Sequence, residues 1–221
     1  MRNLRSKRAR TRRRKPGVEA AQVELRHDQI DAAVQRLDAA AALHPTSVPL
    51  LTVRLSALCV SGKDQRTDVD GLTQALSSAP YGPNTFRAVE LMLDAKSIQS
   101  CKSVQPDDGQ RFARALQQNP TVIQSPRALQ QAFFLEGLAD AHGGHPDPAL
   151  AAFTATLKAG YEFEPAMRMV AELASSGGFE QALQLLDVIS QRETNPSDDR
   201  AREMQHLREE ITRDRANRAA G

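Results

Sequence analysis

The sequence is poor in the residues that most often build large cores or carry chemistry. Its 221 residues include no tryptophan, seven phenylalanines, two tyrosines and two cysteines. Two cysteines are too few for a disulfide framework, and neither stands in the Cys-x2-Cys spacing of a zinc site. No apolar run approaches the roughly 20 residues that span a bilayer. The core must therefore consist mainly of alanine, leucine and valine, which suits closely packed helices.

Motifs of known enzyme classes are also missing. No glycine-rich loop follows a strand pattern, no Gly-x-Ser-x-Gly elbow occurs, and the acidic residues are scattered along helical patterns. We therefore expect a non-enzymatic protein without a cofactor, a metal or a small-molecule substrate. The strongest chemical candidate against this expectation is a metal site at His142, His145 and Asp147. These residues lie in a turn with two glycines, where polar side chains usually face water.

Acidic residues are absent from residues 2–15, which hold nine basic ones. The whole chain has 29 basic and 27 acidic residues, so removing nine basic ones leaves 20 against 27, a formal charge of −7 for residues 16–221. We interpret residues 1–17 as a disordered basic arm, either a solubilising tail or a contact with anionic lipid headgroups or nucleic-acid phosphates. Nucleic acid is the less favoured partner because the rest of the chain is acidic. The arginines proposed for this contact are Arg8, Arg10, Arg12, Arg13 and Arg14.

A period of 33 residues runs through residues 133–186. Gly144, Ala149 and Phe153 recur as Gly177, Ala182 and Leu186. A fixed period with small residues at close contacts and a large apolar residue between them is typical of stacked helical hairpins. The first copy predicts helices at 133–143 and 149–158, and the second predicts helices at 166–175 and 179–191.

The remaining helices follow from apolar spacing and from proline and glycine breaks. We expect a helical pair over residues 18–45 and helices at 48–61, 68–78, 83–95 and 106–118. No segment has a strand alternation. Residues 197–199 can cap a last, highly charged helix, whose end we expect to fray after residue 213. The predicted domains are the arm (1–17), a helical repeat domain (18–196) and a charged capping helix (197–221).

The spacing of Ala33, Leu37, Ala40 and Pro45 resembles the second helix of a tetratricopeptide repeat. Thr156 and Ile189 replace the second alanine of that pattern in the later copies, and the first helices lack its tryptophan and tyrosine. The resemblance implies an α-solenoid of antiparallel, degenerate hairpins that binds a protein or peptide.

A wider resemblance covers about two-thirds of the chain. Residues 55–59, the helix at 83–93 followed by Cys101, the block 112–120 and the later repeat pair are similar to the soluble C-terminal region of bacterial O-antigen ligases and related membrane glycan polymerases. This implies an accessory role in membrane glycan assembly, with any catalysis in membrane parts that this chain lacks. The expected location is the cytoplasm or the inner-membrane surface, or the periplasm for a fragment of a membrane protein.

Cys59 and Cys101 leave two readings open. Both can be free buried thiols, or they can form a bridge between neighbouring hairpins in an oxidising compartment.

Four charged residues are the predicted partner-binding positions, because the first helices of stacked hairpins line the concave face. Each pair lies one turn apart on its own helix. We expect exposed side chains at Glu136, Asp140, Arg168 and Glu172.

Overall fold

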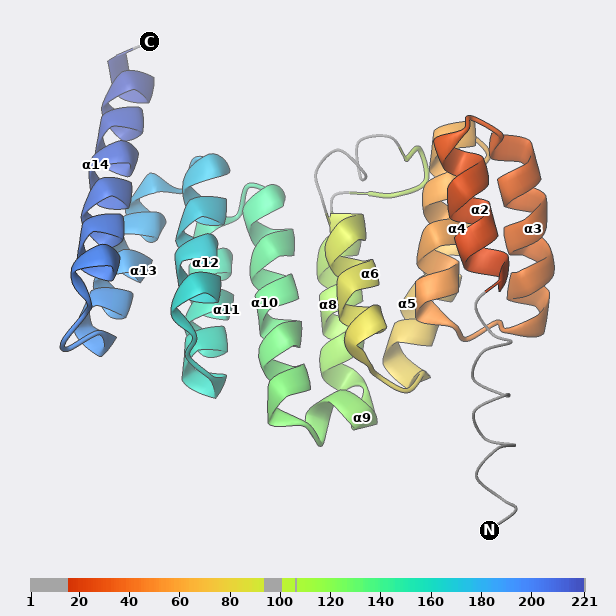
Figure 1. Cartoon of the computed structure of the whole chain (residues 1–221), viewed down its shortest axis with the longest axis horizontal. Helices are drawn as coiled ribbons and strands as arrows, with labels where there is room; N and C mark the ends of the chain where they lie inside the picture. Colours follow the sequence, from red (N-terminus) through yellow and green to blue (C-terminus); the bar gives the residue numbers. More distant parts are fainter. Residues whose placement is uncertain (1–15, 94–100, 106, 221) are drawn as a thin grey trace. The chain divides into compact units, whose positions relative to one another are not determined.

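The computed structural model describes residues 16–93, 101–105 and 107–220. These residues form twelve helices and no strand (Figure 1). The chain separates into two compact units, residues 1–105 and 106–221. The basic arm predicted at residues 1–17, including its five arginines, lies outside the described residues except at its last two positions.

The first unit contains five described helices. They are α2 (Pro16–Arg26), α3 (Ile30–Leu43), α4 (Val48–Ser61), α5 (Arg66–Ser78) and α6 (Pro83–Leu93). Helix α3 packs on α2 and α4, and α4 packs on α5 and α6. The helix predicted at 48–61 is confirmed at both ends, because Pro49 suits a first turn and Gly62 adopts the left-handed conformation that ends the helix.

The second unit contains seven helices. They are α8 (Asp108–Gln118), α9 (Pro120–Ile123), α10 (Pro126–His142), α11 (Pro146–Ala159), α12 (Phe163–Ser175), α13 (Phe179–Arg192) and α14 (Asp198–Ala220). Helix α10 packs against α8, α9, α11 and α12, while α13 packs against α11, α12 and α14. The all-helical class is therefore confirmed for the described residues.

Two helix boundaries differ from the sequence prediction by seven residues, more than the others do. The prediction began the central helix at Phe133, but α10 begins at Pro126, where the Ser125 hydroxyl accepts the Ala128 amide hydrogen at 3.3 Å. Serine before proline is a strong helix start even without apolar periodicity behind it. The last helix was predicted to fray after residue 213, whereas α14 continues to Ala220.

The backbone repeats itself at the 33-residue period. After both α10 and α12, three successive amide groups donate to carbonyls of the preceding turn, and the bonds correspond one to one. They join Gly143 to Ala139, Gly144 to Ala141 and His145 to Asp140, and then Ser176 to Glu172, Gly177 to Ala174 and Gly178 to Leu173. Gly144 and Gly177 have φ of 76° and 89°, in the left-handed region that favours glycine. The period is thus a property of the turn geometry as well as of the sequence.

The same turn also lies between α2 and α3. Asp28 has φ of 60°. Its amide donates to Leu25 and that of Gln29 donates to Glu24, the same offsets as in the two glycine turns. Ala33 follows five residues after Asp28, as Ala149 follows Gly144, and both alanines are fully buried. The sequence period did not reveal this copy because aspartate occupies the place of glycine.

The two cysteines form a disulfide. Cys59 of α4 and Cys101 lie 42 residues apart in sequence, with their Cα atoms 4.4 Å apart. The same segment is also held through Ser103, whose amide donates to the Asp64 carboxylate at 2.6 Å. The sequence left open whether these cysteines are free thiols or form a bridge, and the structure shows the bridge.

Helix α14 lies along α13 through arginines and few apolar contacts. Only Met204 and Ile211 of its described side chains are buried. Arg208 pairs with Asp187 at 2.6 Å, and Arg215 pairs with Glu180. The buried apolar face of this helix is therefore narrow. Its role as the cap of a repeat domain over residues 18–196 stays a prediction.

Candidate partner-binding groove

One face of α10 carries an aromatic ring and two carboxylates. Phe133, Glu136 and Asp140 follow one another at intervals of three and four residues, so they project from the same side of the helix. This face is turned toward α8 and α11, whose residues share a groove with it. Two of the four predicted binding residues, Glu136 and Asp140, are therefore brought together.

Glutamines of α8 hold both carboxylates. Gln117 donates from Nε2 to Glu136 Oε2 at 2.7 Å, and Gln110 donates from Nε2 to Asp140 Oδ1. The two helices run antiparallel, so the earlier glutamine of α8 reaches the later carboxylate of α10. Each carboxylate is thus oriented by a neutral donor.

The groove has a volume of about 400 Å³. Its α11 wall consists of short side chains, and Arg114 stands on the α8 side. The lining residues are Gln110, Arg114, Phe133, Glu136, Asp140, Pro148, Ala151, Ala152 and Ala155. Small residues form one wall of the groove, and a half-buried ring lies on the other.

Asp140 has the least usual environment of these residues. Its residue is 4% exposed. Burial raises the pKa of its carboxyl, and the Gln110 hydrogen bond and the nearby His145 and Arg114 only partly oppose this rise. The two other buried carboxylates of the described chain, Glu90 and Asp108, each pair with an arginine. Asp140 makes no such ion pair with any described residue.

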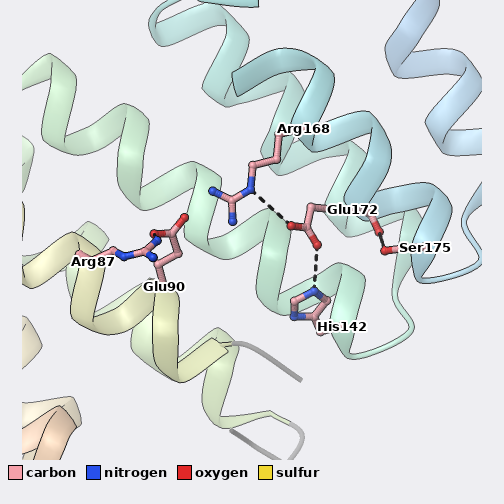
Figure 2. Close-up of polar contacts among 6 residues, drawn as sticks. All are labelled: Arg87, Glu90, His142, Arg168, Glu172 and Ser175. Carbon is pink, nitrogen blue, oxygen red and sulfur yellow. Dashed lines mark hydrogen bonds and ion pairs between the residues drawn. The ribbon is translucent and has the colours of Figure 1, made fainter. Parts of the chain in front are cut away.

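The remaining predicted residues lie on α12 and meet α10 on another side. Figure 2 shows the Glu172 carboxylate between two partners: Oε1 accepts from Arg168 Nε at 3.4 Å, and Oε2 lies 3.2 Å from His142 Nε2. Arg168 also lies over the Phe134 ring, with Cζ 5.2 Å from its centroid. These contacts tie α12 to α10.

The hydrogen bond from His142 is the main cause that holds the pKa of Glu172 below its ordinary value. Burial of the carboxylate opposes this effect, while the charges of His142 and Arg168 add to it. Glu172 is therefore an interhelical contact of the second unit as well as a surface charge.

The structure divides the four predicted residues into two sets. Asp140 and His142 are two positions apart, which turns them by roughly 200° around a helix of 3.6 residues per turn. Glu136 and Asp140 therefore face α8 and α11, while Arg168 and Glu172 meet the other side of α10. The expectation of an exposed Asp140 was wrong, because the residue is 4% exposed and its carboxylate is held by Gln110 of α8. Sequence reasoning missed Gln110 and Arg114 because nothing in the pattern showed that α8 packs on this face.

The alternative metal site does not form. His142 contacts Glu172, whereas Asp147 accepts a hydrogen bond from Gln181 Nε2 at 2.7 Å, so the side chains have separate partners. Within the ranges that the structure describes, no group of three or more histidine, cysteine, aspartate or glutamate residues is placed to hold a metal ion. None of the described helices is both long and apolar enough to cross a bilayer.

Comparison with known proteins gives no family assignment. No protein-family model matches the chain, and neither a curated protein nor a solved structure matches it significantly.

Proposed function

We propose that the chain is a non-enzymatic scaffold that binds a segment of a partner protein, with hairpins arranged as in tetratricopeptide repeats. The observation that carries this proposal is the turn that recurs around Asp28, Gly144 and Gly177 with the same hydrogen bonds. A unit that is repeated in backbone detail presents repeated helix faces, which is how hairpin stacks build binding surfaces.

The groove over α8, α10 and α11 supports the same proposal. It combines an aromatic ring, two oriented carboxylates and a wall of alanines, as a site for a peptide side chain requires. The bacterial membrane glycan assembly system remains the proposed setting. Within it, the chain would act at the inner membrane or in the periplasm as an accessory or soluble domain.

The experiment is proximity labelling in the native host with the full chain and with a chain lacking residues 1–15. Membrane glycan-assembly proteins labelled equally by both chains would support a scaffold that acts through its helical body. Labelling that does not exceed that of an unrelated helical protein of the same abundance would contradict the scaffold.

A second candidate function rests on the separation of charge. Residues 2–15 carry nine basic side chains, and the rest of the chain has a formal charge of −7. The arm would bind anionic lipid headgroups, each basic residue contributing about 1 kcal/mol near the surface. Sedimentation with vesicles containing phosphatidylserine tests this: binding should require the arm and fall as salt rises. Equal binding without residues 1–15 would exclude the arm as the contact.

A further inference from the structure

We propose that the groove over α8, α10 and α11 binds the guanidinium of a single arginine in an extended segment of a partner protein, between Glu136, Asp140 and the Phe133 ring. This rests on the scaffold function and names the ligand chemistry of its site. It follows from the charge, the shape and the rim of the groove.

The groove is lined by two carboxylates and one arginine, Arg114, so its formal charge of −1 favours one additional cation. A buried carboxylate without a paired cation is costly, because burial removes its hydration. The two other buried carboxylates of the described chain have an arginine partner, and Asp140 has a neutral glutamine. A carboxylate offers about four acceptor positions, so one hydrogen bond from Gln110 or Gln117 leaves capacity for a second donor. The guanidinium of a ligand would donate to the acceptor positions that remain free on the two carboxylates.

The shape of the groove favours arginine over lysine. Glu136 and Asp140 lie one helical turn apart, so their Cβ atoms are roughly 5–6 Å apart. A planar guanidinium with five donors can bond to both, whereas an ammonium is a compact point charge. The Phe133 ring is half-buried on the same face and can stack on that plane. Ala151 and Ala155 leave the opposite wall open for the aliphatic part of the side chain.

The rim adds selectivity. Arg114 is exposed and lines the groove, and its charge is felt at Asp140. It would repel a second cation beside the bound arginine and attract a carboxylate there. The preferred ligand is therefore one arginine flanked by an acidic or neutral residue, and a run of basic residues such as 2–15 of this chain fits less well.

The test is a titration of the full, isotopically labelled chain with L-argininamide, followed by NMR at the Asp140 carboxyl carbon and the Phe133 ring. Citrullinamide is the matched probe, because its side-chain urea has nearly the same shape as the guanidinium and no charge, while the rest of the molecule is the same. We expect saturable shifts at both positions with argininamide and none with citrullinamide. Equal shifts with the two probes, or shifts elsewhere only, would overturn the proposal.

Variants assign the effect to the carboxylates. Glu136→Gln, at a half-buried position that a glutamine fills without a change of size, should weaken argininamide binding about tenfold, the cost of one charge-assisted hydrogen bond. The double variant Glu136→Gln/Asp140→Asn should abolish binding. The control Glu203→Gln/Glu210→Gln removes the same charge from exposed positions of α14 and should leave binding unchanged. Unchanged affinity in Glu136→Gln, or an equal loss in the control, would contradict the proposal.

The two proposals fail in different ways. If the full chain labels partners in the host and the double variant labels them equally well, the scaffold stands and the arginine site is wrong. If the wild-type chain labels no partner above background, the scaffold itself is wrong.

Discussion

Gly137 has no side chain at a point where the ring of Phe153 fills the space. A Cβ built there would lie 2.4 Å from Cδ1 and Cε1 of that ring. Val170 and Leu186 stand 33 residues after Gly137 and Phe153, and both are fully buried. The residue on the first helix is thus smaller and the one on the second helix larger in the Gly137/Phe153 pair than in the Val170/Leu186 pair.

This difference in size predicts a rescue. Gly137→Val should lower the free energy of unfolding by about 1–3 kcal/mol through overpacking. Adding Phe153→Leu should restore part of that loss, because the pair then matches the second hairpin. Urea denaturation measures both. The control is Gly71→Ala in α5, where nothing lies within 4 Å of the new Cβ, and it should stabilise by about 1 kcal/mol through helix propensity. A double variant less stable than Gly137→Val would contradict this expectation.

Asp28 and Gly144 occupy the same left-handed turn position with φ of 60° and 76°. A side chain costs roughly 1 kcal/mol there relative to glycine. Asp28→Gly should therefore stabilise the protein by up to about 1 kcal/mol, and Gly144→Ala should destabilise it by a similar amount. Nothing lies within 4 Å of the Cβ that alanine would add at Gly144, so the effect there is conformational alone. Thermal unfolding checks the signs, and the same sign for both changes would show that the turns are not equivalent.

At the scale of the helix, the disulfide closes a segment of the first unit that includes α5 and α6. For a separation of 42 residues, loop-closure entropy predicts a stabilisation of roughly 4 kcal/mol. Reduction should therefore raise amide hydrogen exchange in α4 and α5. The second unit, which has no cysteine, is the internal control and should keep its exchange rates. If reduction accelerated amide hydrogen exchange equally in both units, the two units would not unfold independently.

The contact between α10 and α12 predicts a dependence on pH. The pKa of Glu172 is lowered in the folded protein, mainly by the His142 hydrogen bond. A lowered carboxyl pKa stabilises the fold above the unfolded value of 4.5, and this contribution is lost as pH falls through the folded pKa. The stability difference between the wild type and Glu172→Gln should therefore be largest at neutral pH and shrink below about pH 4.5.

Asp140 is the matched comparison, because burial raises its pKa. Its ionised form opposes folding, and that opposition is relieved as pH falls toward the unfolded value of 3.8. As pH falls, the free energy of unfolding of the wild type should therefore rise relative to that of Asp140→Asn. Over the same pH range it should fall relative to that of Glu172→Gln. Urea titrations from pH 3 to pH 7 measure both differences. If the two differences changed with pH in the same direction, the opposite environments of Glu172 and Asp140 would be contradicted.

Local rules predicted most of the helices and few of the contacts between them. Proline, glycine and apolar spacing located α4 and α13 closely because these signals act within a few residues. The Cys59–Cys101 bridge and the cover that α8 places over Asp140 depend on which helices pack together, which no local pattern encodes. The turn at Asp28 was missed for a different reason. Its backbone is in the left-handed conformation that usually marks a glycine, but the residue is an aspartate.

For the candidate site, the sequence pointed to α10 and α12, and it placed Glu136 and Asp140 side by side, as they lie in the groove. It treated all four charged residues as one exposed face, because the spacing along each helix says nothing about the angle between helices. The division of the four residues follows from helix rotation alone once the position of α8 is known.

At the scale of the molecule, the claim to be tested is that the second unit receives a partner in its groove. A photo-crosslinking residue placed at Ala151, an exposed alanine of the groove, should give a discrete crosslinked partner in the native host. The photo-crosslinking residue placed at Ala201, an exposed alanine of α14, should give no such product. The double variant Glu136→Gln/Asp140→Asn should abolish the product from Ala151. Equal products from both positions, or a product from Ala151 that persists in the double variant, would contradict the account.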